Sequence, residues 1–251
     1  MPAGAAIGII CKTPRAGASK TRLEPLCGRA GAAALAAAFL RDIAATIDAV
    51  PRNLSRTGYA VYAPAGSEAE LKPLLPDDFG LLCRRDSSLG GVLSQAIEYF
   101  LGDGHDCALL VNGDSPTLPL ALLTGAIDAL RRPGDRVVLV PATDGGYCLI
   151  GLKRRHAELF EDIPWSTPGV FAATCARAAE IGLGVEQLPP WYDIDDGATF
   201  AMLRAELDGA PLDFNSARLV GARASATRAL LVRLGLTGVP VADRAGVGSP
   251  S

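Results

Sequence analysis

Short apolar runs alternate along this chain with longer stretches that have helical periodicity. Residues 107–111 include no polar side chain, which is typical of a strand whose sheet is covered on both faces. Residues 31–50 instead place large apolar side chains four positions apart at Leu35, Phe39 and Ile43, so that one helix face is apolar. This alternation predicts a doubly wound α/β fold, a mostly parallel but mixed sheet in three α/β/α layers.

The same pattern gives the expected elements and their order. We expect strands at 5–11, 59–63, 80–84, 107–112, 136–142 and 146–152, with a short one near 185–188. We expect helices at 31–50, 68–75, 89–101, 119–131, 168–181 and 198–207. The prediction is one large domain over 1–209. A C-terminal extension over 210–251 would hold a short helix near 224–234 and a tail that frays from 238.

Charge is unevenly distributed along the 251 residues. The net charge is −3, yet residues 1–60 carry eight basic and three acidic side chains, and four of the cations fall between Lys12 and Arg22. A local basic patch on an acidic chain suits a small polyanion such as a nucleotide and argues against binding to nucleic acid.

The spacing of the cysteines and the lengths of the apolar runs indicate where in the cell the protein is expected. No two of the six cysteines are closer than sixteen positions, and only two histidines are present, so zinc-site spacing is absent. We interpret the cysteines as reduced and mostly buried, as in a cytoplasmic protein. No apolar run approaches the roughly 20 residues of a membrane span, and the first run, 5–11, has no basic residue before it.

A basic loop follows the first predicted strand. Pro14 and Gly17 favour a turn there, and the loop's cations can converge on an anion. It is not an ATPase phosphate loop, because Ser19 stands where the motif needs glycine. The predicted phosphate-binding residues are Lys12, Arg15, Gly17, Lys20 and Arg22. The alternative is a solvated basic loop.

An acidic loop follows the strand at 107–112. Gly113 permits close approach of a ligand, and Asp114 would then project at the carboxyl edge of the sheet. A divalent cation needs one or two such carboxylates, with phosphate oxygens and water as the other ligands. Equally, Asp114 or Ser115 could cap the helix that begins near Pro119.

The turn at 144–146 offers a second acidic position. Asp144, Gly145 and Gly146 are typical of a tight turn, and that interpretation is somewhat favoured. Two glycines also expose backbone to a ligand, and Asp144 could accept hydrogen bonds from hydroxyl groups.

Two downstream segments carry aromatic and acidic residues. Trp165 could belong to the core or form a flat platform for a sugar or base, and Ser166 or Thr167 could cap the next helix. Asp193 and Asp195 would share one face of an extended segment and repel each other unless a cation joins them. A helix cap by Asp195 or its neighbour Asp196 is the alternative.

Five motifs in this order resemble one family. They read KxPxxGxxKTRL at 12–23, GDSPxL at 113–118, PAxDGGYxLIGL at 141–152, IPWST at 163–167 and WxDxD at 191–195. The chain resembles bacterial GT-A-fold, nucleotide-diphospho-sugar-transferase-like proteins, some of them assigned to arsenosugar biosynthesis as glycosyltransferases. It is more distantly similar to guanylyl- and molybdopterin-type nucleotidyltransferases.

The resemblance implies a GT-A fold that holds a nucleotide diphosphate and Mg²⁺ or Mn²⁺. The basic loop would contact phosphates, Asp114 and Asp195 the metal, and Asp144 with Gly145, Gly146 and Trp165 the sugar or acceptor. Asp114 and Asp144 would be the catalytic residues. One segment departs from the family pattern: residues 84–92 lack its usual arginine, unless Arg84 or Arg85 substitutes.

Three functions fit these residues. The first is glycosyl transfer from a nucleotide sugar to a small-molecule acceptor, in which the metal and basic loop stabilise the departing diphosphate. The second is nucleotidyl transfer from a nucleoside triphosphate to a phosphorylated acceptor with release of pyrophosphate. The third is nucleotide binding without catalysis. The base candidates are Asp144, Asp193 and Asp195.

Overall fold

The computed structural model describes residues 4–237 and contains one mixed sheet of seven strands. The strands are β1 (Ala5–Lys12), β2 (Arg56–Ala63), β3 (Gly80–Cys83), β4 (Cys107–Asn112), β5 (Arg136–Pro141), β6 (Tyr147–Leu152) and β7 (Gly184–Gln187). Their order across the sheet is β3-β2-β1-β4-β6-β5-β7, and β6 alone runs antiparallel to its neighbours. The predicted fold class is confirmed, including the mixed sheet.

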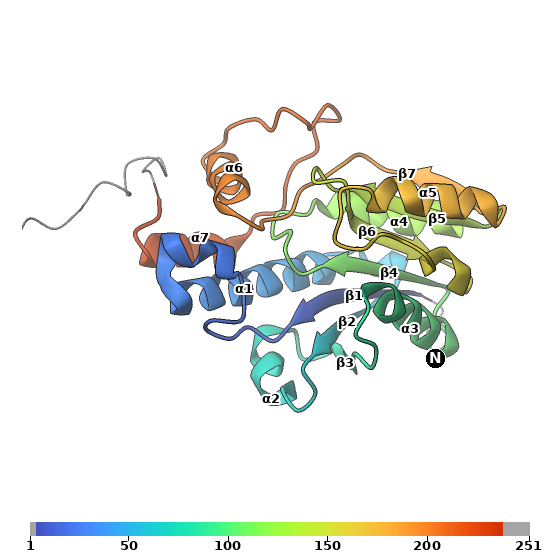
Figure 1. Cartoon of the computed structure of the whole chain (residues 1–251), viewed down its shortest axis with the longest axis horizontal. Helices are drawn as coiled ribbons and strands as arrows, with labels where there is room; N and C mark the ends of the chain where they lie inside the picture. The colour runs from blue at the N-terminus through green and yellow to red at the C-terminus, as the bar shows by residue number, and fades with distance from the viewer. Residues whose placement is uncertain (1–3, 238–251) are drawn as a thin grey trace, which may run out of the picture.

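Helices cover both faces of this sheet (Figure 1). They are α1 (Glu24–Asp48), α2 (Glu68–Leu71), α3 (Leu89–Gly102), α4 (Leu120–Arg131), α5 (Val170–Glu180), α6 (Gly197–Leu207) and α7 (Ser225–Arg233). In β4, Leu109 and Val111 join the core formed with α1 and α4, whereas Ala108 and Leu110 join the core formed with α3 and α5. A strand buried on both faces has no polar side, which explains its unbroken apolar run.

The strand order places several strand ends at one edge. The chain passes from β1 to β2 and β3 on one side and then returns to β4 on the other side of β1. Because β1, β4 and β5 are parallel to one another, the loops that follow them leave the sheet together. Ligand sites in sheets of this kind lie at such a change of direction.

The structure corrects two sequence-based expectations about helix α1. It begins at Glu24 rather than near residue 31, although Gly28, with φ of 71°, interrupts the regular helix. The segment Thr21–Asp48 is also apolar and long enough to cross a membrane by length and composition, contrary to the expectation that no such run exists. In the structure, 61% of the apolar 18-residue stretch within this segment is buried, as in the core helix of a folded domain.

All six cysteines are free, as expected, with Cys11, Cys107 and Cys148 buried. The cytoplasmic location inferred from them stays a prediction.

The predicted C-terminal helix exists as α7 and lies against α1 (Figure 1). Leu230 and Leu231 share the core of α1. Asp42 of α1 is 5% exposed, and its carboxylate accepts hydrogen bonds from the backbone of Ala226 at 2.8 Å and from the Thr227 hydroxyl at 2.6 Å. The backbone nitrogen of Thr227 also donates to it, at 2.8 Å. The domain boundary at 209 stays a prediction, and the tail from 238 lies outside the described residues.

Asp42→Ala is therefore expected to lower the free energy of unfolding by about 2–4 kcal/mol, because the first turn of α7 loses its buried acceptor. Urea-induced unfolding measures the change. Asp128→Ala, at an exposed position on α4, is the matched control and should change stability by less than about 0.5 kcal/mol. Equal stability of the two variants would contradict the docking role of Asp42.

Candidate functional site

A cleft of about 780 Å³ lies at the carboxyl ends of β1, β4 and β5. Its volume is within the usual range for small-molecule sites. Four basic and four acidic side chains line it: Lys12, Lys20, Arg22, Arg84, Asp114, Asp144, Asp193 and Asp195. The predicted edge of the sheet therefore holds the candidate site.

The basic loop contributes only part of its predicted set to the cleft. Lys12, Lys20 and Arg22 line it. Arg15 instead points away and pairs with Glu70, with 2.5 Å between Nη2 and Oε1, and Gly17 forms a turn with φ of 77° outside the lining. The structure thus brings three of the five residues to the cleft. Their binding of phosphate stays a prediction.

Lys20 is a cation of the cleft whose side chain is only 8% exposed. Its ammonium lies 2.7 Å from Oδ1 of Asp114 and 3.0 Å from Oδ1 of Asp195. It also donates to the carbonyl oxygen of Ile194 at 2.5 Å. An ammonium has three protons. Lys20 therefore bridges the loop after β4 and the segment before α6, and it has no further proton for a ligand in this arrangement.

The segment that carries Asp193 and Asp195 is fastened to the loop after β4. Ser115 donates from its hydroxyl to the carbonyl oxygen of Tyr192 at 2.8 Å, and the Ile194 nitrogen donates to the carbonyl oxygen of Asp114 at 2.9 Å. Neither Asp114 nor Ser115 caps α4, whose first flanking residue is Pro119. These contacts fix both aspartates at the floor of the cleft.

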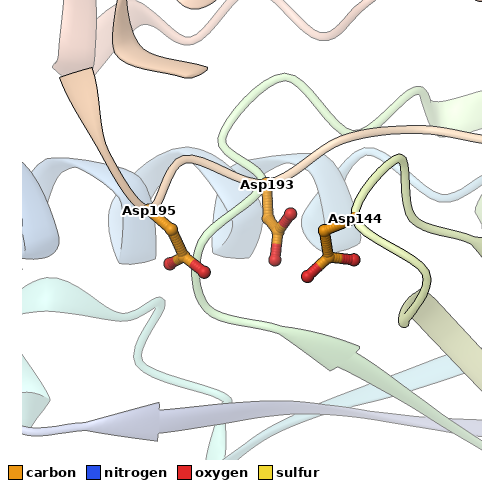
Figure 2. A group of neighbouring side chains, drawn as sticks. All are labelled: Asp144, Asp193 and Asp195. Carbon is orange, nitrogen blue, oxygen red and sulfur yellow. The ribbon is translucent and has the colours of Figure 1, made fainter. Parts of the chain in front are cut away.

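Three carboxylates converge there. One oxygen each from Asp144, Asp193 and Asp195 lies within 4.8 Å of the others. Figure 2 shows the three side chains in a row, with Asp144 on the turn between β5 and β6. Within residues 4–237, neither Asp144 nor Asp193 has a Lys or Arg at ion-pair distance. Such a set of hard oxygen ligands fits Mg²⁺ or Mn²⁺.

The pKa values reflect this crowding. Burial, together with the neighbouring charges of Asp144 and Asp195, raises the pKa of Asp193 to about 7. The pKa of Asp114 is also raised by desolvation in the cleft, an effect that Lys20 opposes. A nearby divalent cation would favour the charged form of Asp193.

Asp144 occupies the tight turn that the sequence predicts. Its Oδ1 accepts from the Gly146 nitrogen at 2.9 Å, and Gly145 has φ of 94°. A side chain at Gly145 would also collide with the backbone of Pro168, and the Phe171 nitrogen donates to the Gly145 carbonyl at 2.9 Å. The turn is confirmed, and it is held against the segment that precedes α5.

That segment supplies the aromatic side of the cleft. Trp165 lines the cleft while packing partly against the core beside Gly90, so the core and platform interpretations are both compatible with its position. The predicted helix cap is wrong by two residues: α5 begins at Val170 after Gly169, because Thr167 accepts from the Gly169 nitrogen instead. Gly146 lines the cleft and Gly145 does not.

The predicted site set lacked two of the eight charged residues of the cleft. Asp193 was only a base candidate, although its alternation with Asp195 was the available signal. Arg84 rather than Arg85 reaches the cleft, and it donates from Nη2 to the Cys11 carbonyl oxygen at 3.1 Å. Of the two neighbouring cap candidates, Asp196 caps α6 in a capping box, and Asp195 lines the cleft.

The fold and this acidic and basic cleft define a class, three-layer proteins with a polar site at the carboxyl edge of a mixed sheet. Residues 46–167, just under half of the chain, match a family model described as "Uncharacterized protein conserved in bacteria (DUF2064)". No match was found among curated proteins.

Solved structures give the clearest likeness. A Desulfovibrio desulfuricans G20 protein, provisionally described as a nucleotide-diphospho-sugar transferase, is 27% identical with a TM-score of 0.78, over 92% of this chain and 95% of its own. CMP:2-keto-3-deoxy-manno-octonic acid synthetase, complexed with CTP, is 11% identical with a TM-score of 0.54, over 82% and 98%. Glucosyl-3-phosphoglycerate synthase of Mycobacterium tuberculosis, in complex with Mn²⁺, UDP and glucosyl-3-phosphoglycerate, is 9% identical with a TM-score of 0.50, over 84% and 81%.

These findings confirm the resemblance to nucleotide-diphospho-sugar-transferase-like proteins. The two lower identities show a shared fold, common to glycosyl- and nucleotidyltransferases.

Proposed function

We propose that this protein is a metal-dependent transferase that moves a glycosyl group from a nucleoside diphosphate sugar to a hydroxyl-bearing acceptor. The observation that supports this most is the convergence of three carboxylates, beside a buried lysine, in one cleft. The named relatives support the choice of a nucleotide-activated donor.

Asp193 and Asp195 would hold Mg²⁺ or Mn²⁺, because such ions in transferases bind one or two carboxylates and complete their shell with phosphate oxygens. When bound, the cation neutralises charge that develops on the departing diphosphate. Asp114 was predicted as a ligand. Lys20 occupies Oδ1 of Asp114 and Oδ1 of Asp195 alike, but Asp114 lies outside the cluster of three carboxylates, so its direct binding of metal stays a prediction and we propose that it orients Lys20.

The donor phosphates would lie against the basic end of the cleft. Lys12, Arg22 and Arg84 line it with free donor groups, and Lys20 adds charge without a free proton. Arg84 would thus substitute for the arginine that the family usually carries in the segment at 84–92. These cations would stabilise the negative charge of the diphosphate.

The charge balance of the cleft favours glycosyl over nucleotidyl transfer. Four basic and four acidic side chains cancel, so a divalent cation leaves an excess of two positive charges. The diphosphate of a nucleotide sugar matches that excess, whereas a nucleoside triphosphate carries roughly twice as much negative charge.

Asp144 is the base that we propose for the acceptor hydroxyl. Its Oδ2 is left free by the hydrogen bond to Oδ1, and it lies at the end of the carboxylate row next to the aromatic wall. Gly145 and Gly146 shape the turn that holds it, and Trp165 offers a flat surface for a sugar ring.

Calorimetry with UDP, GDP and the corresponding triphosphates, with and without Mn²⁺, tests this function. We expect Mn²⁺-dependent binding in which the diphosphate binds more tightly than the triphosphate. The reverse order, together with release of pyrophosphate, would favour nucleotidyl transfer. Metal-independent binding that survives Asp114→Ala would indicate a binding protein without catalysis.

Asp195→Asn should weaken Mn²⁺-dependent diphosphate binding at least about tenfold, because the metal loses a charged ligand. Asp196→Asn is the matched control, since Asp196 caps α6 and asparagine is an equally good cap. Equal affinities of the two variants would remove Asp195 from the metal site.

A further inference from the structure

The charge of the cleft changes sign along the edge of the sheet. The basic side chains gather at the end of β1: Lys12 ends that strand, and Arg84 is bound to the Cys11 carbonyl oxygen beside it. Lys20 lies one strand further, at Asp114 after β4. The cations therefore occupy the side of the cleft where the donor diphosphate is proposed to bind.

The opposite end is acidic. Asp144 follows β5, which is three strand positions from β1 in the order β1-β4-β6-β5. With strands spaced about 4.8 Å apart, the two ends are separated by about 14 Å. Asp144 and Asp193 have no Lys or Arg at ion-pair distance in the part of the chain that the structure describes. Once Asp193 and Asp195 hold the cation, an anion at this end would still meet the carboxylate of Asp144.

The cleft wall next to the Asp144 turn has no charged side chain among its lining residues from 165 to 170. The lining there comes from the segment before α5, which the contacts of Gly145 with Pro168 and Phe171 hold in place. Its cleft-lining residues are Trp165, Ser166, Thr167, Pro168 and Val170. This wall offers hydroxyl groups, an aromatic face and apolar surface, which suit a sugar or polyol.

We propose that the acceptor is an uncharged hydroxyl compound, a sugar or polyol without phosphate or carboxylate. The inference rests on the proposed function and deepens it. A phosphorylated acceptor would need a cation on the wall at 165–170, and none of its five lining residues provides one. The same feature separates this site from nucleotidyl transfer to a phosphate group.

The proposed transfer forms one bond, breaks one bond and moves one proton. The acceptor oxygen forms a bond to the anomeric carbon while the bond from that carbon to the diphosphate oxygen breaks. The electron pair leaves on the diphosphate, and the hydroxyl proton passes to Asp144.

Matched pairs of probes test the inference. Calorimetry first establishes Mg²⁺-dependent diphosphate binding, and loss of that binding would overturn the proposed function and this inference with it. The loaded protein is then titrated, by ligand-observed NMR, with glycerol against glycerol 3-phosphate and with glucose against glucose 6-phosphate. We expect the neutral member of a pair to bind at least tenfold more tightly. Tighter or equal binding of the phosphate, or binding of neither member, would overturn the inference while leaving the diphosphate result intact.

A charge-gain variant makes the test sharper. Ser166→Lys places a cation on the neutral wall and should improve binding of the phosphorylated member at least threefold. Thr21→Lys adds the same charge at the basic end and is the matched control, expected to leave the preference unchanged. The same gain in both variants would show that the wall has no special part in acceptor choice.

Discussion

Asp193→Asn is expected to lower metal-dependent transfer by about 10³-fold and, at pH 8, to make the metal-free protein more stable. The first effect follows because the variant removes one of the two proposed charged ligands. The second follows because burial and the charges of Asp144 and Asp195 raise the pKa of Asp193 to about 7. Asparagine has nearly the same shape and no charge to repel.

The direction of the pH effect comes from the two states of the protein. Asp193 releases its proton near pH 4 when the chain is unfolded and near pH 7 when it is folded. Between these values the folded state binds more protons, so the contribution of Asp193 to stability falls as pH rises and levels off above about 7. The gain from asparagine should therefore be larger at pH 8 than at pH 5. We expect about 2 kcal/mol at pH 8, or about 4–8 °C in Tm.

Thermal unfolding at the two pH values, with and without Mn²⁺, measures these effects. Mn²⁺ should raise the Tm of the unaltered protein and leave Asp193→Asn nearly unchanged, because a ligand stabilises only the state that binds it. Asp196→Asn should behave like the unaltered protein in both assays. A Tm that falls on Asp193→Asn at pH 8 would mean that the carboxylate is stabilising and that the repulsion argument is wrong.

The elements could be predicted because their signals are local. Strands β1, β4 and β5 are apolar runs that need both faces buried, and any sheet that contains them brings their following loops to one edge. The turn at Asp144 was readable for the same reason, since two glycines after an aspartate favour few other conformations.

Side-chain partners could not be predicted where they depend on distant segments. Asp193 joins Asp144 because Trp191 forms a bridge with Ala142 beside the end of β5, a contact between residues far apart in sequence. Arg15 has the same charge as Lys20 and lies in the same loop. It pairs, however, with Glu70, 55 positions away, and points out of the cleft. Neither of these contacts can be predicted from the local sequence.

The helix caps could not be assigned to single residues, for a different reason. Asp195 and Asp196 are both good cap residues, and Thr167 competes with Gly169 for the start of α5. The alternatives differ by about 1 kcal/mol locally, so tertiary contacts decide between them.

Lys20→Met is expected to weaken diphosphate binding about tenfold while Mn²⁺ alone binds more tightly. Removal of a positive charge beside Asp114 and Asp195 increases the attraction of the acidic cluster for a cation and decreases that of the cleft for an anion. Stability should fall by only about 1–3 kcal/mol, since both aspartates are partly exposed, at 41% and 49%, and can be hydrated again. Methionine keeps the length and the backbone demands of lysine at this position.

The opposite signs of the two affinities separate a charge effect from a purely positional one. If Lys20 served only to hold Asp195 in place, its loss would free that carboxylate, and the affinities for Mn²⁺ and for the diphosphate would fall together. Calorimetry with Mn²⁺ alone and then with UDP or GDP decides between these outcomes. Lys72→Met, at an exposed lysine outside the cleft, controls for the loss of one positive charge from the whole protein. A collapse of Tm in Lys20→Met, with Lys72→Met unaffected, would instead make the bridge between Asp114 and Asp195 a requirement of folding, and the cleft would then need another group to attract the diphosphate.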